Sequence, residues 1–321
     1  ALTETELFYS KAWLHANGSA TGTPFLGLES DYVETVSRHY TDSNNNGQWD
    51  SGETTTWDPE LEYFWPKAPE SYINFISWFA TNSKNPAIAE VSGTPITSTM
   101  TWGSDASPFT IASDDNFLFA DEAWRYRDNA TTYQSVSGVA EGVPTLFHHL
   151  LAKISFRVRV SEVLSNVTIT VRNFSLTGVY TTGTLALSNS DPASGPQTRA
   201  WTGGWSFTGE TAGSVSGAAS LTPGTSWQFL LGETSVLPQD IDDIRVVFSY
   251  DISTQIDSNN AISETVPVSI ALSDFGIVEM LMNQKITCSI TINPALQQIS
   301  IDPAEIEAWV NETEQTIVVN E

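Results

Sequence analysis

The chain of 321 residues carries 38 Asp and Glu against 13 Lys and Arg, a net charge of −25, and 40% of its residues are hydrophobic. This composition predicts about two folded domains, and it excludes both a disordered chain and a surface that binds nucleic acid or anionic membranes. No run approaches 18 apolar residues and the first residues form no signal peptide, so we expect no membrane-spanning helix, and an exported protein would begin here after its processed segment.

The first distinctive segment is a polar loop, TDSNNNGQWDSGET, at Thr41–Thr54. It matches the calcium-loop pattern of oxygen donors at positions 1, 3, 5, 7, 9 and 12 around a glycine at position 6. The predicted ligands are Asp42, Asn44, Asn46, the backbone carbonyl of Gln48, Asp50 and Glu53. Such hard donors suit a structural Ca²⁺ ion that pins the loop. The alternative is a metal-free turn, because Asn and Gly tolerate positive φ.

The next segments are apolar and aromatic, at Tyr63–Ala80 and Asn116–Trp124. Within the first, SYINFISWFATN at Ser71–Asn82 fits either a strand or a short helix, because its apolar residues follow neither period cleanly. A polar, glycine-containing stretch at Arg125–Gly142 then separates these segments from a more regular pattern. We therefore predict a domain boundary near residue 145, with one domain at 1–144 and the second at 145–321.

The segment VPTLFHHLLAK at Val143–Lys153 follows this boundary and could hold one helical turn. His148 and His149 are adjacent, so on a strand they would point to opposite faces and could not share one metal ion. We expect one of them to pack under a sheet and the other to meet solvent.

From Lys153 onward the sequence alternates polar and β-branched or aromatic residues, the pattern of half-buried antiparallel strands. These segments are Lys153–Val160, Asn166–Leu176, Asp243–Ser253, Thr265–Leu272, Lys285–Ile292 and Thr316–Val319. The segment Asp302–Val310 fits either a turn with an acidic start or the approach to a strand. The sequence predicts an all-β fold of two antiparallel, Greek-key β-sandwich domains.

Signals of catalysis are absent from the sequence. No GxSxG, HExxH, P-loop or dinucleotide fingerprint occurs among its 321 residues. The one cysteine, Cys288, alternates in step with Ile286 and Ile290, which predicts a buried structural thiol instead of a nucleophile. We therefore predict that the chain is not an enzyme and has no cofactor other than the calcium ion.

Six segments occur in a defined order along the chain: Tyr63–Ala80 with its Trp-Pro step, Asn116–Trp124, Val143–Val160, Leu176–Leu187, Phe229–Gln239 and Ile299–Val319. This ordered set, which spans about residues 60 to 321, resembles the fimbrillin family. Within it, VPTLFHHLLAKISFRVRV resembles the family's L-x-F-x-H-x-L-(A/S)-K-I signature at Leu146, His148 or His149, Leu151, Ala152, Lys153 and Ile154.

This resemblance implies a subunit of the type V pili of anaerobic gut and oral bacteria, built from two transthyretin-like domains. Such subunits are exported as lipoproteins, trimmed by proteolysis and polymerised at the cell surface by donor-strand exchange. The expected partners are other pilus subunits in a head-to-tail polymer, and a host or bacterial surface ligand. The donor strand would be Thr316, Ile317, Val318 and Val319, with Ile317 and Val319 on one face.

Two other functions remain open from the residues alone. The chain has 11 tryptophans, and Trp57, Trp65, Trp201 and Trp205 near turns could form a carbohydrate-binding face, although a β-sandwich also buries tryptophan as core. A secreted glycosidase could hide its carboxylate pair, because the separation of that pair is spatial. An exposed row of Trp rings would favour carbohydrate binding, and a cleft with two facing carboxylates would favour a glycosidase. An edge strand missing from either sandwich, or a C-terminal strand that extends away, would favour the pilus subunit.

Overall fold

Strands account for nearly all regular structure in the computed structural model, which describes residues 7–16, 22–27, 31–46, 50, 55–64, 71–91, 96–127, 143–190, 197–309 and 315–317. The helical elements in these ranges are two 3-10 turns, η1 (Thr81–Ser83) and η2 (Leu272–Phe275). The predicted all-β fold is therefore confirmed. None of the helices in these ranges has the length and apolar character needed to cross a membrane.

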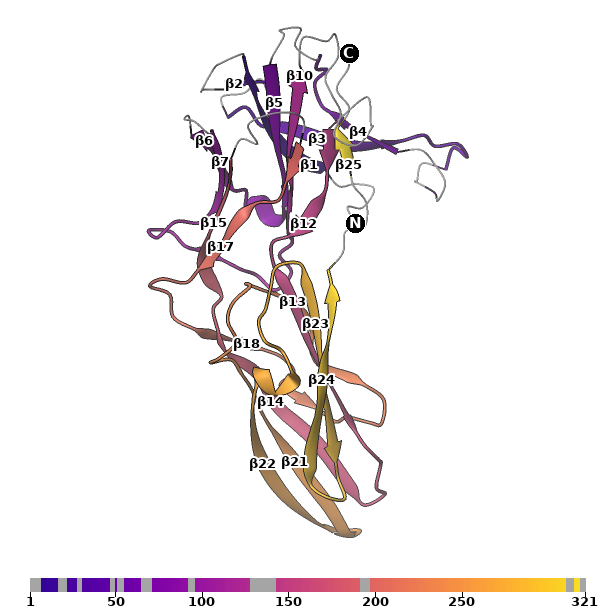
Figure 1. Ribbon diagram of the computed structural model, residues 1–321. Coiled ribbons are helices and arrows are strands. Elements are labelled where there is room, and N and C mark those ends of the chain that lie inside the picture. The colour runs from indigo at the N-terminus through magenta and orange to yellow at the C-terminus, as the bar shows by residue number, and fades with distance from the viewer. Residues whose placement is uncertain are drawn as a thin grey trace.

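Two sheets form the upper half of the molecule in Figure 1, which we call the N-terminal unit. The larger sheet has eleven strands, eight of them in the order β11 (Val143–Thr145), β25 (Gln315–Ile317), β4 (Thr55–Pro59), β3 (Glu34–Tyr40), β1 (Leu7–His15), β5 (Ser71–Ala80), β10 (Glu122–Arg127) and β16 (Gln197–Arg199). Short strands attached to it are β2 (Thr23–Pro24), β9 (Phe117–Ala120) and β12 (Phe147–His149). The smaller sheet has the order β17 (Thr202–Ser206), β15 (Thr182–Ser190), β7 (Thr97–Trp102) and β6 (Ala87–Val91), with β8 (Phe109–Thr110) on β15.

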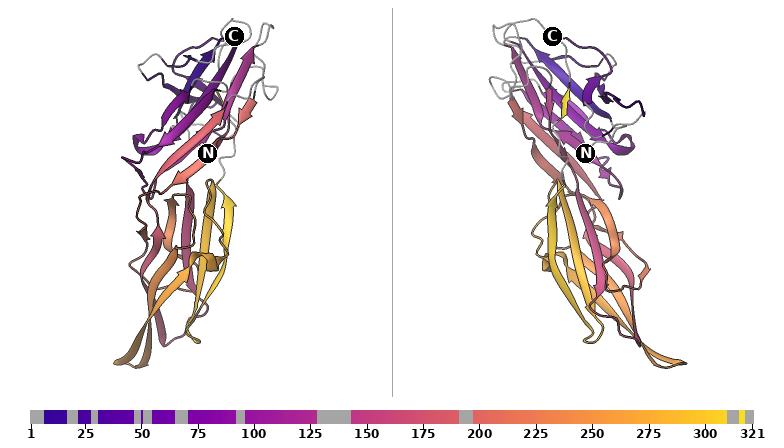
Figure 2. Two further views of the ribbon diagram at one scale, coloured as in Figure 1. Left: turned by 60° about the vertical axis from the view of Figure 1, so that its left-hand side comes forward. Right: turned by 90° about the vertical axis from the view of Figure 1, so that its right-hand side faces the viewer.

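The lower half, which we call the C-terminal unit, is a sandwich of two sheets (Figure 2). One sheet has the order β20 (Gln228–Val236), β13 (Ala152–Val160), β23 (Gln284–Asn293) and β24 (Gln298–Ala308). The other has the order β18 (Gly213–Ser216), β14 (Val167–Val179), β21 (Arg245–Asp257) and β22 (Asn260–Ala271), with β19 (Ser220–Leu221) on β14. Both sheets contribute to one buried core, in which Cys288 is fully buried. Burial raises the pKa of its thiol, as expected of a structural cysteine.

The strand β5 explains how the N-terminal unit holds two cores. Ile73 and Phe75 join a cluster on one side of the large sheet, whereas Ile76 and Ala80 join a second cluster that the smaller sheet covers. A strand buried on both faces shows no alternation, which is why the sequence of this segment also fitted a short helix. The strand ends at Ala80, and Asn82 in η1 has a positive φ of 57°.

Two features of the strand pairing differ from the prediction. The pairs β13–β23 and β25–β4 are parallel, so the sheets are not purely antiparallel. In addition, β15 pairs with β7, and β16 with β10, which brings residues 182–190 and 197–199 back to the N-terminal unit. The change of unit near residue 150 lies close to the predicted boundary at 145, but the N-terminal unit takes strands from three separate parts of the chain.

Two segments that the sequence left open between a turn and a strand form strands in the structure. Val143–Lys153 contains no helical turn, because β11, β12 and the start of β13 occupy it. Here Phe147 and His149 face inward while His148 is half-buried, a period of two that excludes a helical face. Asp302–Ala308 belongs to β24, which pairs with β23 along its length.

Candidate functional site

The C-terminal strand β25 lies within the N-terminal unit, between β11 and β4 (Figure 1, Figure 2). It runs antiparallel to β11, with Ile317 opposite Val143 and Gln315 opposite Thr145. On its other side it runs parallel to β4, with Ile317 opposite Trp57. A segment from the far end of the sequence therefore completes the sheet that the first residues begin.

The strands on either side depend on β25 for their outer pairing. On its inner side β4 pairs with β3 over five residue pairs, from Val36–Pro59 to Tyr40–Thr55. Among the described strands, β11 has no sheet partner except β25. Without β25, the backbone N–H and C=O groups of β4 would form an open sheet edge, which is the template that another extended segment pairs with.

An aromatic cluster lies at this edge of the large sheet. Phe8 on β1 is completely buried, with its ring centroid 5.3 Å from that of Trp57 and 5.1 Å from that of Phe147. Trp57 and Val143, the two residues in register with Ile317, belong to the same buried cluster. The edge therefore has an apolar floor, whose side chains come from β1, β4, β11 and β12.

The chain that leads to β25 is anchored at the junction of the two units by Trp309. The Trp309 backbone N–H donates to the carbonyl of Asn283 at 2.7 Å. Its ring stacks on His149 at 3.6 Å between centroids, and the Lys153 ammonium lies 4.5 Å from it. Because His149 ends β12, four residues after β11, the root of the C-terminal segment lies near the start of its pairing site.

The predicted donor strand overlaps β25 in part. Thr316 and Ile317 belong to it, it begins one residue earlier at Gln315, and Val318 and Val319 lie outside the described residues. The predicted facing of Ile317 and Val319 stays a prediction. The residues that receive the strand, in β4 and β11, were not identified from the sequence, because segments of three to five residues carry no recognisable periodicity.

The predicted calcium loop is described in part. The Asp50 carboxylate accepts hydrogen bonds from the side-chain amides of Asn44 at 2.5 Å and Asn46 at 2.7 Å. The Asn46 backbone N–H lies 3.2 Å from a carboxylate oxygen of Asp42. Four of the predicted ligands thus converge, whereas Gln48 and Glu53 lie outside the described residues. Asn44 and Asn46 direct amide nitrogens at Asp50, so hydrogen bonds hold this part of the loop together, and calcium binding stays a prediction.

The four tryptophans proposed for a carbohydrate-binding face do not share one surface. Trp57 is core, at 5% exposure, and Trp65 lies outside the described residues. Trp201 and Trp205 are half-buried, and their indole N–H groups donate to the carbonyls of Ala120 at 2.9 Å and Leu150 at 3.3 Å. A buried ring and two indoles bonded to the backbone do not make an exposed row of rings.

The histidines take structural positions. His149 is buried, with Nδ1 2.9 Å from the Asn116 side-chain oxygen. His148 is half-buried, 3.1 Å from Asp121. The expected split between an inner and an outer histidine is confirmed. In the part of the chain that the structure describes, no group of three or more His, Cys, Asp and Glu side chains could hold a metal ion.

A buried polar cluster between the two sheets of the N-terminal unit was not predicted. Glu122 on β10 is completely buried and accepts hydrogen bonds from Ser98 on β7 at 2.6 Å and from Asn74 on β5 at 2.9 Å. Burial raises the pKa of the Glu122 carboxyl to about 7. The hydrogen bonds oppose this increase in pKa, and the negative charge of Glu90 adds to it. Glu90 itself lies 2.9 Å from the buried ring of His15.

Comparison with known proteins gives one family and several distant structures. Residues 27–309 match the family described as fimbrillin-like. No curated protein matches the chain. A fimbrial protein from Bacteroides vulgatus is 14% identical, with a TM-score of 0.48 over 94% of this chain and 93% of that protein.

Two subunits from Porphyromonas gingivalis also match. Its tip fimbrial protein is 10% identical, with a TM-score of 0.26 over 95% of each chain. Its fimbrial anchor protein is 10% identical, with a TM-score of 0.27 over 96% of this chain and 90% of that one.

Proposed function

Because this chain belongs to the fimbrillin-like family, a structural and non-enzymatic family, we propose that it is a structural or adhesive subunit of a surface fimbria. The subunit would occupy a shaft, tip or accessory position and assemble by donor-strand exchange. Its partners are other fimbrial subunits, and an exposed position would also allow it to bind a host or bacterial surface ligand. Export as a lipoprotein to the outer membrane belongs to the same proposal.

One observation carries the assembly mechanism: β25 pairs with β11 and β4, far from β24, which directly precedes it in the chain. A strand that pairs with a distant part of its own chain can be replaced by the same strand of a neighbour, because the receiving backbone groups are identical. In the fimbria, residues 315–319 of one subunit would then lie between β4 and β11 of the next. Such a head-to-tail contact is heterologous and does not close, so it builds a filament.

The anchoring of Trp309 supports this mechanism. The segment from residue 309 to 315 spans at most about 20 Å when extended, and its root is fixed by the contacts of Trp309 with Asn283 and His149. A neighbour that docks end to end would receive the segment from a fixed starting point, which lowers the entropy cost of ordering it.

We further propose that the C-terminal unit is a transthyretin-like Greek key. Its successive strands change sheet after β13, before and after β20, and again before β23, and β13 and β23 lie parallel at the centre of one sheet. A calcium ion in the Asp42 loop is also proposed, where it would hold the connection between β3 and β4 and so stiffen one of the strands that receive β25.

The test uses a chain truncated after Trp309 as the acceptor. A synthetic peptide of residues 310–321 should bind this chain and restore the melting temperature that truncation lowers. The full-length protein, incubated with the tagged truncated chain, should be captured by it as a heat-stable complex that runs as a discrete band.

Ile317→Pro provides the matched control, because proline removes a backbone N–H and cannot continue a central strand. The Ile317→Pro peptide and a scrambled peptide should neither bind nor stabilise the truncated chain. A truncated chain that melts with the full-length protein and captures neither peptide nor protein would refute the exchange mechanism.

A further inference from the structure

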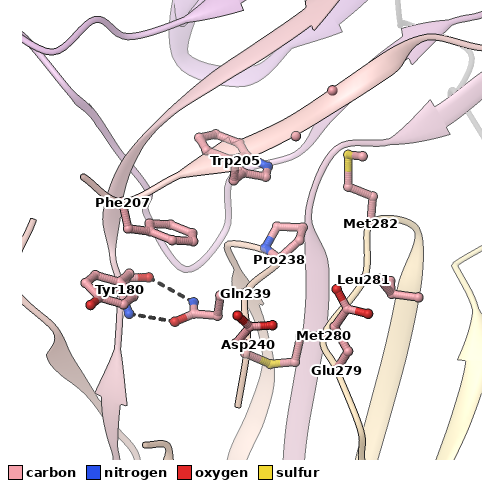
Figure 3. Close-up of a pocket in the computed structure, with 12 residues that line it drawn as sticks. Tyr180, Trp205, Phe207, Pro238, Gln239, Asp240, Glu279, Met280, Leu281 and Met282 are labelled. Carbon is pink, nitrogen blue, oxygen red and sulfur yellow. Dashed lines mark hydrogen bonds between the residues drawn. The ribbon is translucent and has the colours of Figure 1, made fainter. Parts of the chain in front are cut away.

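A pocket lies at the junction of the two units, away from the β25 site, and has a volume of about 420 Å³. Its lining comes from β17, from the end of β14 and from the loops that precede β21 and β23 (Figure 3). In this view Trp205 and Phe207 lie along one side, and Asp240 and Glu279 along the other. The volume is within the range of pockets that hold a small molecule or a large side chain.

The floor of the pocket is a rigid bridge between two loops. Gln239 and Met280 form an isolated antiparallel bridge through two backbone hydrogen bonds of 3.1 and 3.2 Å. The buried Gln239 side chain accepts from the Tyr180 N–H at 2.8 Å and donates to the Tyr180 carbonyl at 3.2 Å. Tyr180 in turn stacks on Phe207 at 4.7 Å between ring centroids. The bridge and the aromatic wall are therefore held together before any ligand arrives.

Two carboxylates flank this bridge. Asp240 follows Gln239 and Glu279 precedes Met280, and both side chains line the pocket. Two negative charges at one pocket repel each other, so a positive charge between them is favourable. No Lys or Arg lines the pocket, and neither carboxylate belongs to an ion pair in the described part of the chain. A positively charged group from another molecule would therefore neutralise these two carboxylates.

The opposite side of the pocket offers an open sheet edge. Among the described strands, β17 is one of the two edge strands of the smaller sheet, and its Gly203 and Gly204 line the pocket. A side chain at Gly204 would meet no atom within 4 Å, so open space lies above this strand. Unpaired backbone groups at such an edge pair readily with an extended peptide.

We propose that this pocket binds an arginine side chain carried by an extended peptide segment of a partner protein. The guanidinium group would bridge Asp240 and Glu279, because its planar fork of donors matches carboxylates, and it would stack on the aromatic wall. Its aliphatic stem would cover Leu281, which is 45% exposed at the rim. The peptide backbone would run along β17.

Two other occupants fit the pocket less well. A neutral saccharide would stack on the aromatic wall but would leave the two negative charges of Asp240 and Glu279 uncompensated. A glycosidase reaction needs one carboxyl group that burial keeps protonated, and both of these carboxyl groups are exposed.

The test is fluorescence anisotropy with a labelled, end-blocked Gly-Thr-Arg-Thr-Gly peptide. Its control peptide carries citrulline, which has the shape of arginine without the charge. We expect the arginine peptide to bind at least tenfold more tightly than the citrulline peptide. The double variant Asp240→Asn with Glu279→Gln should lose this difference. The double variant Asp242→Asn with Glu264→Gln, which removes the same charge from exposed positions outside the pocket, should keep it.

A second pair of variants tests the pocket without changing charge. Gly204→Leu places a side chain in the open space above β17 and should abolish binding. Gly232→Leu, at an exposed position of β20 where a side chain also meets no atom within 4 Å, should leave binding unchanged. Melting temperatures of all variants verify that they fold.

Four results would overturn the proposal. They are equal affinity for the arginine and citrulline peptides, loss of the arginine preference in the control double variant, full peptide binding to Gly204→Leu, and binding of maltotriose or chitobiose at Trp205 in place of the peptide. None of these results bears on the β25 site, because no residue is shared.

Discussion

Glu122 makes the stability of the N-terminal unit depend on pH. Its carboxyl group is completely buried between β10, β5 and β7, and burial raises its pKa from an ordinary 4.5 to about 7. The two pKa values differ by about 2.5, and at about 1.4 kcal/mol per pKa unit this corresponds to roughly 3 kcal/mol of unfolding free energy.

The sign follows from proton binding. Between pH 4.5 and about 7 the folded state holds a proton on Glu122 that the unfolded state has released, so the free energy of unfolding falls as pH rises. Below pH 4.5 both states are protonated and the penalty vanishes. Above about 7 the penalty is complete, because the folded state must bury a carboxylate beside Glu90.

The substitution Glu122→Gln tests this reasoning, since glutamine has nearly the same shape and no charge. Its Oε1 atom can still accept the hydrogen bonds from Ser98 and Asn74. Urea denaturation at several pH values should give equal stability for both proteins near pH 4.5 and an advantage of up to about 3 kcal/mol for the variant at pH 8.

The matched control is Glu162→Gln, at an exposed loop position, which should follow the wild-type pH dependence. Ionisable groups that do not interact with Glu122 contribute equally to the wild type and to Glu122→Gln, so they cancel in the difference. Parallel curves for the wild type and Glu122→Gln between pH 4.5 and 8 would refute the assignment of this pH dependence to Glu122.

Three further predictions concern packing, backbone and metal. Phe8→Ala should lower the free energy of unfolding by roughly 3–5 kcal/mol in urea denaturation, because it opens a cavity beside Trp57. Gly178→Ala should cost about 1–3 kcal/mol in the same assay, because φ is +78° and a Cβ would lie 2.2 Å from the Asp243 carbonyl. Calcium at a hundredfold excess over Kd should stabilise the protein by about 2.7 kcal/mol in thermal melts, an effect that Asp50→Ala removes and Asp105→Ala, on another exposed loop, retains.

The sequence predicted those parts of the fold that local pattern determines. In β13, Ile154, Phe156, Val158 and Val160 are buried as their alternation indicated, because one face of a half-buried strand must be apolar over its whole length. The same logic located Cys288 in the core. These strands carry their signal within nine or ten residues, so no knowledge of the partner strand was needed.

The candidate sites depend on pairings between segments that are distant in sequence. Asp240 and Glu279 line one pocket because Gln239 and Met280 form a bridge, and nothing in the sequence near either residue signals the other. β11 includes Pro144, which by itself argues against a strand. Its pairing with β25 depends on the rest of the large sheet, which a single sequence does not reveal.

The strands on either side of β25 are also held by other pairings. In the described residues, β25 has three residue pairs with β11 and one with β4. Releasing β25 costs a fraction of the global unfolding free energy, because local stability follows the number of pairs and contacts that are lost. The strands it leaves would stay ordered, since β4 keeps five pairs with β3 and β11 continues into β12, which pairs with β9. Donor-strand exchange requires such an acceptor, one that can release its own strand without unfolding, and these unequal pairings would provide it.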